Sequence, residues 1–168
     1  EVLELGVHLL IEKPMAEGMN TARELVRLAD EQNVQFTVTQ QYRYSPAPQK
    51  LREMVSQGAL GQMTGGMVQF YRWRPTQGMV LPILLNQGVH HFDAIRYILG
   101  ANPVACMADL WDPAWNGCDG PTVVEATLRF TDGTRVPYSG SYVAKGQVTP
   151  YDALWRFEGS EGQITFDG

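Results

Sequence analysis

The beginning of the chain combines short apolar runs with one amphipathic stretch. Residues 6–14, GVHLLIEKP, form an apolar run that ends in a polar tripeptide with proline, which predicts a buried strand and the loop after it. Residues 20–33 carry apolar side chains at helical spacing behind Asn20, the expected N-cap, and residues 34–38 predict a second strand. Strand, helix and strand in this order predict a parallel unit whose polar site, including Lys13, lies beyond the carboxyl ends of the strands.

Beyond residue 44 the pattern changes to helices followed by a series of strands. Ser45 and Pro46 are typical of an N-cap and the first residue of a helix that runs to about Gln57, and residues 82–100 predict another helix. Alternating or β-rich runs occupy residues 67–73, 104–111, 122–130, 135–143, 153–159 and 163–166. The pair Asp132-Gly133 and the segment 159–162 are hairpin signals between them. We therefore expect an α/β (α+β) fold with a mostly antiparallel sheet packed on helices.

One edge of the helix predicted from residue 82 is polar. At about 100° per residue, Asn86, His90, Asp93 and Tyr97 form one stripe, and His91 points about 100° away from His90. The apolar arc expected against the sheet consists of Leu85, Val89, Phe92, Ile95 and Leu99. The stripe is a solvent-facing edge, a metal site, or a catalytic edge on which His90 exchanges a proton near neutral pH. We expect His90 to serve chemistry and His91 to be structural or peripheral.

Length and composition are those of an ordinary globular protein. With 168 residues and 44% hydrophobic content, the chain fits one domain, or one domain and part of another. No apolar run approaches the roughly 20 residues of a membrane span, and we expect no signal peptide in the opening residues, because they show neither a basic n-region nor a cleavage site. The net charge of −5, with both signs interspersed, argues against a nucleic-acid surface and favours small molecules or proteins as partners. Cys106 and Cys118 lack metal-ligand spacing, so we expect buried thiols and a cytoplasmic location.

The other polar candidates are not specific by themselves. Lys13 follows a buried strand, but most loop lysines are solvated, and Glu12 can be its surface counter-charge. Tyr42 and Arg43 follow the second strand and can equally be amphipathic surface cover.

Taken in order, four segments resemble the Gfo/Idh/MocA family of NAD(P)-dependent oxidoreductases, which act mostly on sugars, polyols and related small molecules. Residues 6–14 resemble the strand and EKP signature of that family, and residues 41–63 resemble its next strand end and linking helix. Residues 84–100 resemble its substrate-domain helix with a G-V-H-x-x-D core, and residues 157–168 resemble its late hairpin. The similarity runs through essentially the whole chain.

The resemblance assigns roles to individual residues. Lys13 matches the EKP lysine, which in the family lies between nicotinamide and substrate, and His90 matches the histidine usually assigned as acid/base. Asn86 stands where many members have aspartate, so a charged Asp/His relay is not supported, whereas a hydrogen-bonding role is. The implied site comprises Lys13, His90 and Asn86 for catalysis, Tyr42, Arg43 and Asp93 for the substrate, and Glu12, Lys13 and Pro14 for the cofactor, NAD or NADP.

The resemblance also predicts an incomplete protein. The sequence contains no G-x-G-x-x-G turn, on which family members hold the pyrophosphate of the dinucleotide. We therefore expect residues 1–44 to be the C-terminal remnant of a Rossmann-type domain. Residues 45–168 are then expected to form a substrate and oligomerisation domain, truncated at its C-terminus.

Two functions remain open at this point. The first is the substrate-domain portion of a sugar or polyol dehydrogenase; the second is a non-catalytic binding or oligomerisation module derived from the family, which binds no cofactor by itself. In both cases we expect a homo-oligomer formed through the sheet face and no nucleic-acid or membrane partner. The loops at residues 71–80 and 112–121 are expected to choose the substrate, although their side chains suit many sugars.

Overall fold

The computed structural model describes residues 2–74, 82–116, 120–146 and 148–167, in two compact units. Residues 1–41 form the N-terminal unit and residues 42–168 form the C-terminal unit. The division falls close to the boundary expected after residue 44. Cys118 and residues 75–80 of the loop at residues 71–80 lie outside the described residues.

The N-terminal unit is a small strand–helix–strand arrangement, as the pattern predicts. It contains a 3-10 turn η1 (Leu3–Leu5), β1 (Leu9–Ile11), α1 (Met19–Glu31) and β2 (Phe36–Val38). The two strands are parallel, with Leu9 opposite Phe36 and Ile11 opposite Val38. The expected cap was wrong by two positions, because Gly18 is the N-cap and Asn20 lies inside the first turn of α1.

The C-terminal unit is built on a six-stranded sheet with the order β4-β5-β6-β3-β7-β8. The strands are β3 (Met63–Tyr71), β4 (Ala105–Trp111), β5 (Val123–Arg129), β6 (Arg135–Ser141), β7 (Leu154–Gly159) and β8 (Gly162–Phe166). Only the β3–β6 pairing within this described sheet is parallel; every other pairing is antiparallel. This arrangement confirms the expected α+β class.

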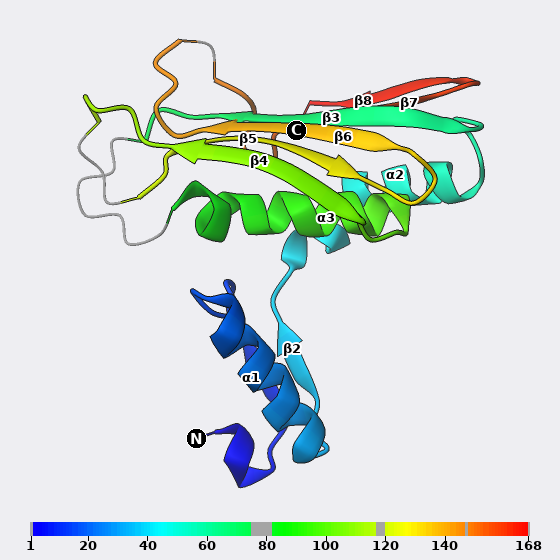
Figure 1. Cartoon of the computed structure of the whole chain (residues 1–168). Coiled ribbons are helices and arrows are strands. Elements are labelled where there is room, and N and C mark those ends of the chain that lie inside the picture. The colour runs from blue at the N-terminus through cyan, green and yellow to red at the C-terminus, as the bar shows by residue number, and fades with distance from the viewer. Residues whose placement is uncertain (1, 75–81, 117–119, 147, 168) are drawn as a thin grey trace. The chain divides into compact units, whose positions relative to one another are not determined.

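Two helices, α2 (Pro46–Ser56) and α3 (Val89–Leu99), cover one face of the sheet (Figure 1). Ser45 is the N-cap of α2 with extended backbone and Pro46 is its first residue, as the sequence predicts. The buried core joins α3 to the sheet through residues such as Ile95, Val68 and Phe157, each fully buried. None of the helices in the described residues combines the length and apolar character that a membrane span requires.

The opposite face of the sheet is open, and β4 lies at its edge (Figure 1). Every residue of β4 is exposed, including Met107 and Trp111. The expectation of a buried thiol at Cys106 is therefore wrong: its side chain is exposed, because an edge strand has a neighbour on one side only and lies outside the part of the sheet buried by the helices. Glu125, Asp109 and Met107 belong to the open face, since cross-strand partners share a face.

Candidate active site

The histidine pair follows a π-helical turn, η3 (Leu84–Gly88), which runs directly into α3. The predicted distribution of faces around this helix is partly wrong. His90 is only 4% exposed and Asp93 only 7%, so the polar stripe is no solvent-facing edge. The fully buried face instead contains His91, Ala94 and Ile95, whereas most of the predicted apolar arc is only half-buried. The helix is covered on two sides, by the sheet and by the segment that precedes α2. The helical wheel assumed one buried side and one solvent-exposed side, so it could not predict the second covered side.

Tyr42 covers His90. It belongs to a 3-10 turn, η2 (Gln41–Tyr44), and its ring stacks on the imidazole with the ring centres 4.5 Å apart and the planes 9° apart. The amide Nε2 of Gln87 donates a hydrogen bond to the phenol oxygen of Tyr42 at 2.9 Å. Burial raises the pKa of Tyr42 well above its ordinary value, and the neighbouring Tyr151 and Asp152 add to this rise. Tyr42 is therefore a neutral phenol, fixed over one face of His90.

Arg43 anchors the same turn to α3. Its Nε donates to Oδ2 of Asp93 at 2.7 Å, and its Nη2 donates to the other carboxylate oxygen, so the pair is bidentate. Hydrogen bonding to Asp93 raises the pKa of the Arg43 guanidinium against a smaller opposing effect of burial. Because Asp93 is buried and its charge is met by Arg43, the pair holds Tyr42 in place over His90.

His91 points into the core instead. Its Nδ1 forms a hydrogen bond with the hydroxyl of Tyr138 at 2.9 Å, and its ring touches those of Phe70 and Trp155. Burial, helped by the neighbouring His90, lowers the pKa of His91 to about 3. His91 is thus a neutral structural residue, and of the two expectations, structural or peripheral, the first is confirmed.

The predicted residues therefore fall into two groups. His90, Tyr42, Arg43 and Asp93 lie together in the C-terminal unit, and Asn86 lies half-buried in the π turn just before them. Gln87 is a contact that the sequence did not suggest, because its role depends on the π turn. Among the described residues, no three His, Cys, Asp or Glu side chains gather closely enough to hold a metal ion.

The second group lies in the N-terminal unit. Glu12, Lys13 and Pro14 follow the carboxyl end of β1, the edge at which parallel strands bind ligands. The hydroxyl of Thr39, just after β2, donates to Oε2 of Glu12 at 2.9 Å. The family resemblance assigns these residues to the nicotinamide end of a dinucleotide, and polar side chains at this edge are compatible with that assignment. The sequence offers no glycine turn for the pyrophosphate, so the residues present fit one end of the cofactor only.

A parallel strand–helix–strand unit and an α+β unit with a covered histidine are the features of a nucleotide-dependent oxidoreductase with a separate substrate domain. The chain belongs to the Gfo/Idh/MocA family, as the sequence resemblance indicated. Residues 49–165 match the Gfo/Idh/MocA C-terminal domain, and residues 1–40 match the oxidoreductase family described as an NAD-binding Rossmann fold.

Similar proteins agree with this assignment. The chain is 26% identical to the 1,5-anhydro-D-fructose reductase of Ensifer adhaerens, over 96% of this chain and 50% of that protein. It is 25% identical to the scyllo-inositol 2-dehydrogenase (NADP(+)) IolW of Bacillus subtilis, over 96% of this chain and 48% of the relative. The crystal structure of the WlbA dehydrogenase from Bordetella pertussis, in complex with NADH and UDP-GlcNAcA, has the same fold, with a TM-score of 0.89 at 21% identity over 99% of this chain and 54% of that one. The chain thus spans about half the length of the curated relatives it matches.

Proposed function

We propose that this chain is the substrate-domain portion of a cytoplasmic NAD(P)-dependent dehydrogenase that acts on a sugar or polyol by hydride transfer. The observation that carries the proposal is the buried His90, held under Tyr42 by the Arg43–Asp93 pair. The neighbouring His91 is a structural histidine: it is buried in the core and bonded to the Tyr138 hydroxyl. It has no ion pair that fixes a ring over it among the described residues, whereas His90 has one in Arg43–Asp93. Membership of an NAD-binding family supplies the reaction class.

The chain's own residues handle the proton and the charge. When bound, a nicotinamide nucleotide supplies the carbon that takes up the hydride. His90 accepts the proton of the substrate hydroxyl as the hydride leaves the same carbon. Asn86 orients the imidazole or the substrate by hydrogen bonding. The resemblance to the family gives Lys13 the role of stabilising negative charge during the reaction. Arg43, fixed by Asp93, and Tyr42 line the substrate side.

Nucleotide binding and turnover test this proposal. In the full-length dehydrogenase, we expect saturable binding of NADH or NADPH, followed by nucleotide fluorescence, and oxidation of polyols. His90→Asn should then lower turnover by about 10²–10⁴-fold with little change in the circular dichroism spectrum, because it removes the proton acceptor. His8→Gln is the matched control, since His8 is exposed and lies outside the site, and it should leave turnover unchanged. Normal turnover in His90→Asn would remove His90 from the mechanism.

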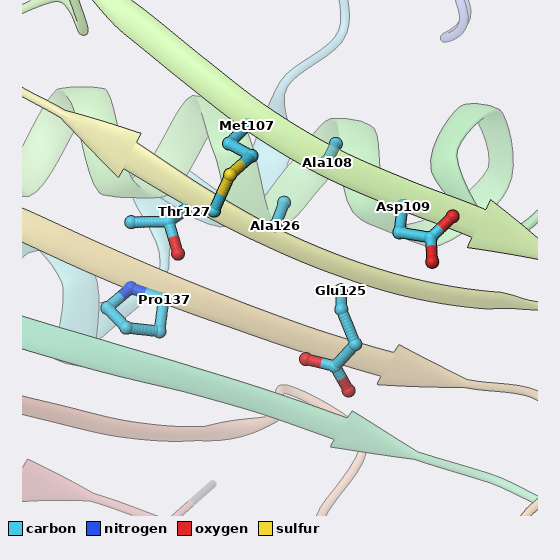
Figure 2. Close-up of a pocket in the computed structure, with 7 residues that line it drawn as sticks. All are labelled: Met107, Ala108, Asp109, Glu125, Ala126, Thr127 and Pro137. Carbon is cyan, nitrogen blue, oxygen red and sulfur yellow. The ribbon is translucent and has the colours of Figure 1, made fainter.

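The open face of the sheet favours a second function, a non-catalytic assembly module. Met107, Asp109 and Glu125 line a shallow pocket of about 270 Å³ together with Ala126 and Pro137. Figure 2 shows the side chains of Met107, Asp109 and Glu125 on the side of the strands away from α3. Met107 is 76% exposed, and Trp111 of the same strand is 40% exposed. A second copy of the chain packed on this face would bury them.

Two measurements separate the functions. An enzyme binds nucleotide and turns over, whereas an assembly module only self-associates. We expect sedimentation equilibrium to show a dimer that Met107→Lys converts to a monomer, with Leu5→Lys, an equally exposed position in the N-terminal unit, as the control. A monomer at all concentrations would exclude the assembly module, and self-association without any binding at millimolar nucleotide would favour it over the enzyme.

A further inference from the structure

Two arginines follow β3 on the face of the sheet that the helices cover. The chain stays extended after Tyr71, because Arg72 N and Arg74 N donate to the carbonyl oxygens of Ser141 and Tyr142, each at 2.8 Å. Side chains in an extended segment alternate between faces, so Arg72 and Arg74 lie on the side of Phe70, which touches His91. Arg74 indeed lies over the ring of the buried Tyr142, at 5.4 Å.

The intervening residue belongs to the other face. Trp73 stacks on Trp115 with the ring centres 6.4 Å apart, and the ammonium of Lys145 lies 4.6 Å from the Trp73 ring centre. This aromatic cluster is therefore separate from the arginine pair.

Within the residues that the structure describes, the two guanidinium groups have no anionic partner. Both side chains are half-buried, and neither forms an ion pair within the described part of the chain. The Nε of Arg72 is buried and has no hydrogen-bond acceptor among the described residues. A buried charged donor without an acceptor costs more than a neutral one, so an acceptor from outside the chain would stabilise it.

The arginines adjoin the candidate active site through Tyr151. The guanidinium carbons of Arg72 and Arg74 lie 5.7 and 5.9 Å from the centre of the Tyr151 ring. Tyr151 in turn neighbours Tyr42, the residue stacked on His90, and Asp152 lines a small cavity with Tyr42. Among the described residues, Asp152 makes no ion pair with either arginine.

We propose that the substrate handled at His90 carries an anionic group, a carboxylate or a phosphate, and that Arg72 and Arg74 bind this group. The inference rests on the proposed function for the reaction, but it specifies the substrate class. A guanidinium presents paired N–H donors that match the oxygens of a carboxylate or a phosphate, and burial strengthens such pairs. A neutral sugar would leave both arginines without a counter-charge.

Matched probes test the inference by calorimetry on the full chain. D-Glucuronate and D-glucose 6-phosphate carry the two anionic groups, and D-glucose is the neutral counterpart with the same ring. We expect both anions to bind at least about tenfold more tightly than glucose, and more weakly as salt is raised. The relative affinity of the two anions identifies which group the site prefers.

Substitutions locate the effect. Arg72→Gln and Arg74→Gln should each weaken binding of the preferred anion by about tenfold and leave glucose unchanged, while Arg72→Lys keeps the charge and should retain part of the affinity. Arg96→Gln is the matched control, because Arg96 lies exposed in the last turn of α3 and its side chain binds Asn102. Melting curves by circular dichroism verify that each variant is folded.

The possible failures are distinguishable. Equal affinity for the three probes, no binding of either anion, or unchanged affinity in both Arg72→Gln and Arg74→Gln would overturn the anionic substrate class. Turnover of neutral polyols without this preference would retain the dehydrogenase and reject the inference. Arginine-dependent anion binding without any nucleotide-dependent turnover would retain the anion site and reject the dehydrogenase.

Discussion

His91 is the least exposed titratable side chain of α3, and its surroundings explain why it stays neutral. The residue is fully buried among Phe70, Tyr138 and Trp155. Its Nδ1 has the Tyr138 hydroxyl as partner, whereas its Nε2 is buried with no partner in the described structure. A second proton on the imidazole would create a charge in an apolar core, next to His90, which is the reason that the pKa falls to about 3.

This burial predicts acid lability. Above the ordinary pKa of 6.5, His91 is neutral in both the folded and unfolded chains and has no effect on the pH dependence of stability. Below it the unfolded chain takes up a proton that the folded chain refuses until about pH 3, so stability falls as pH falls, by about 1.4 kcal/mol per pH unit. Urea unfolding at pH 7 and pH 4.5 should show this loss.

A double substitution isolates the effect. His91→Phe alone should cost about 1–3 kcal/mol at pH 7, because it leaves the buried Tyr138 hydroxyl without a partner. His91→Phe combined with Tyr138→Phe removes both polar groups and should recover most of that loss. The double variant should also lose about 2–3 kcal/mol less than the natural chain between pH 7 and pH 4.5. Equal losses in the two proteins would show that His91 does not govern the acid response.

At the same scale, the sequence named Arg43 and Asp93 as candidates but did not predict that they pair. Arg43 and Asp93 were separate candidates, and no pattern joins two positions so far apart in the chain. Their ion pair depends on how η2 lies on α3, which is a tertiary contact. Gln87 and Arg72 were missed as individual residues for the same reason, although the loop at residues 71–80 was named as one that chooses the substrate.

At the scale of elements, one glycine allows the residue just before the π turn η3 to pack directly against the sheet. A Cβ on Gly140 of β6 would lie 3.0 Å from Val124, 3.0 Å from Tyr138 and 3.1 Å from Ile83, the residue just before η3. All three neighbours are fully buried and cannot move away freely. The absence of a side chain at Gly140 therefore lets the start of the helical segment pack directly on β6.

Gly140→Ala should consequently destabilise the C-terminal unit by about 1–3 kcal/mol, since an extra methyl group overpacks a full core. It should also displace η3 and weaken the Gln87–Tyr42 contact, which changes the environment of His90. Urea unfolding gives the first effect and the NMR shifts of His90 give the second. Gly146→Ala is the control, because a Cβ there meets nothing within 4 Å, and an equal effect of the two substitutions would contradict the packing argument.

Most elements could be predicted because each has a local signal. The Ser45-Pro46 start of α2 is an example, and so is the β5–β6 turn, where both carboxylate oxygens of Asp132 bind Thr134. Exposure could not be predicted in the same way. The apolar and β-rich sequence of β4 suggests a covered strand, but its place at the edge of the sheet exposes it, and that place is set by strand order.

At the scale of the whole molecule, the two units have very different cores. The connected hydrophobic core lies entirely in the C-terminal unit, from Leu51 to Phe157. In the described N-terminal unit, Leu3 and Ala29 are the buried apolar residues, whereas Leu10 in the middle of β1 is 66% exposed. A parallel strand is normally buried on both faces, but β1 is not. The N-terminal unit therefore buries little apolar surface to offset the conformational entropy that its chain loses on folding.

We therefore predict that the two units open independently in this chain. Backbone amides in α1, β1 and β2 should exchange with deuterium orders of magnitude faster than those in β3, β5 and β6, because local opening of a small core costs far less free energy than global unfolding. Hydrogen exchange followed by mass spectrometry measures both units in one experiment. Repeating it at several protein concentrations is the control, since self-association that protected α1 would slow its exchange as concentration rises. Equal protection of β2 and β6 at every concentration would show that the N-terminal unit is as stable as the rest of the chain.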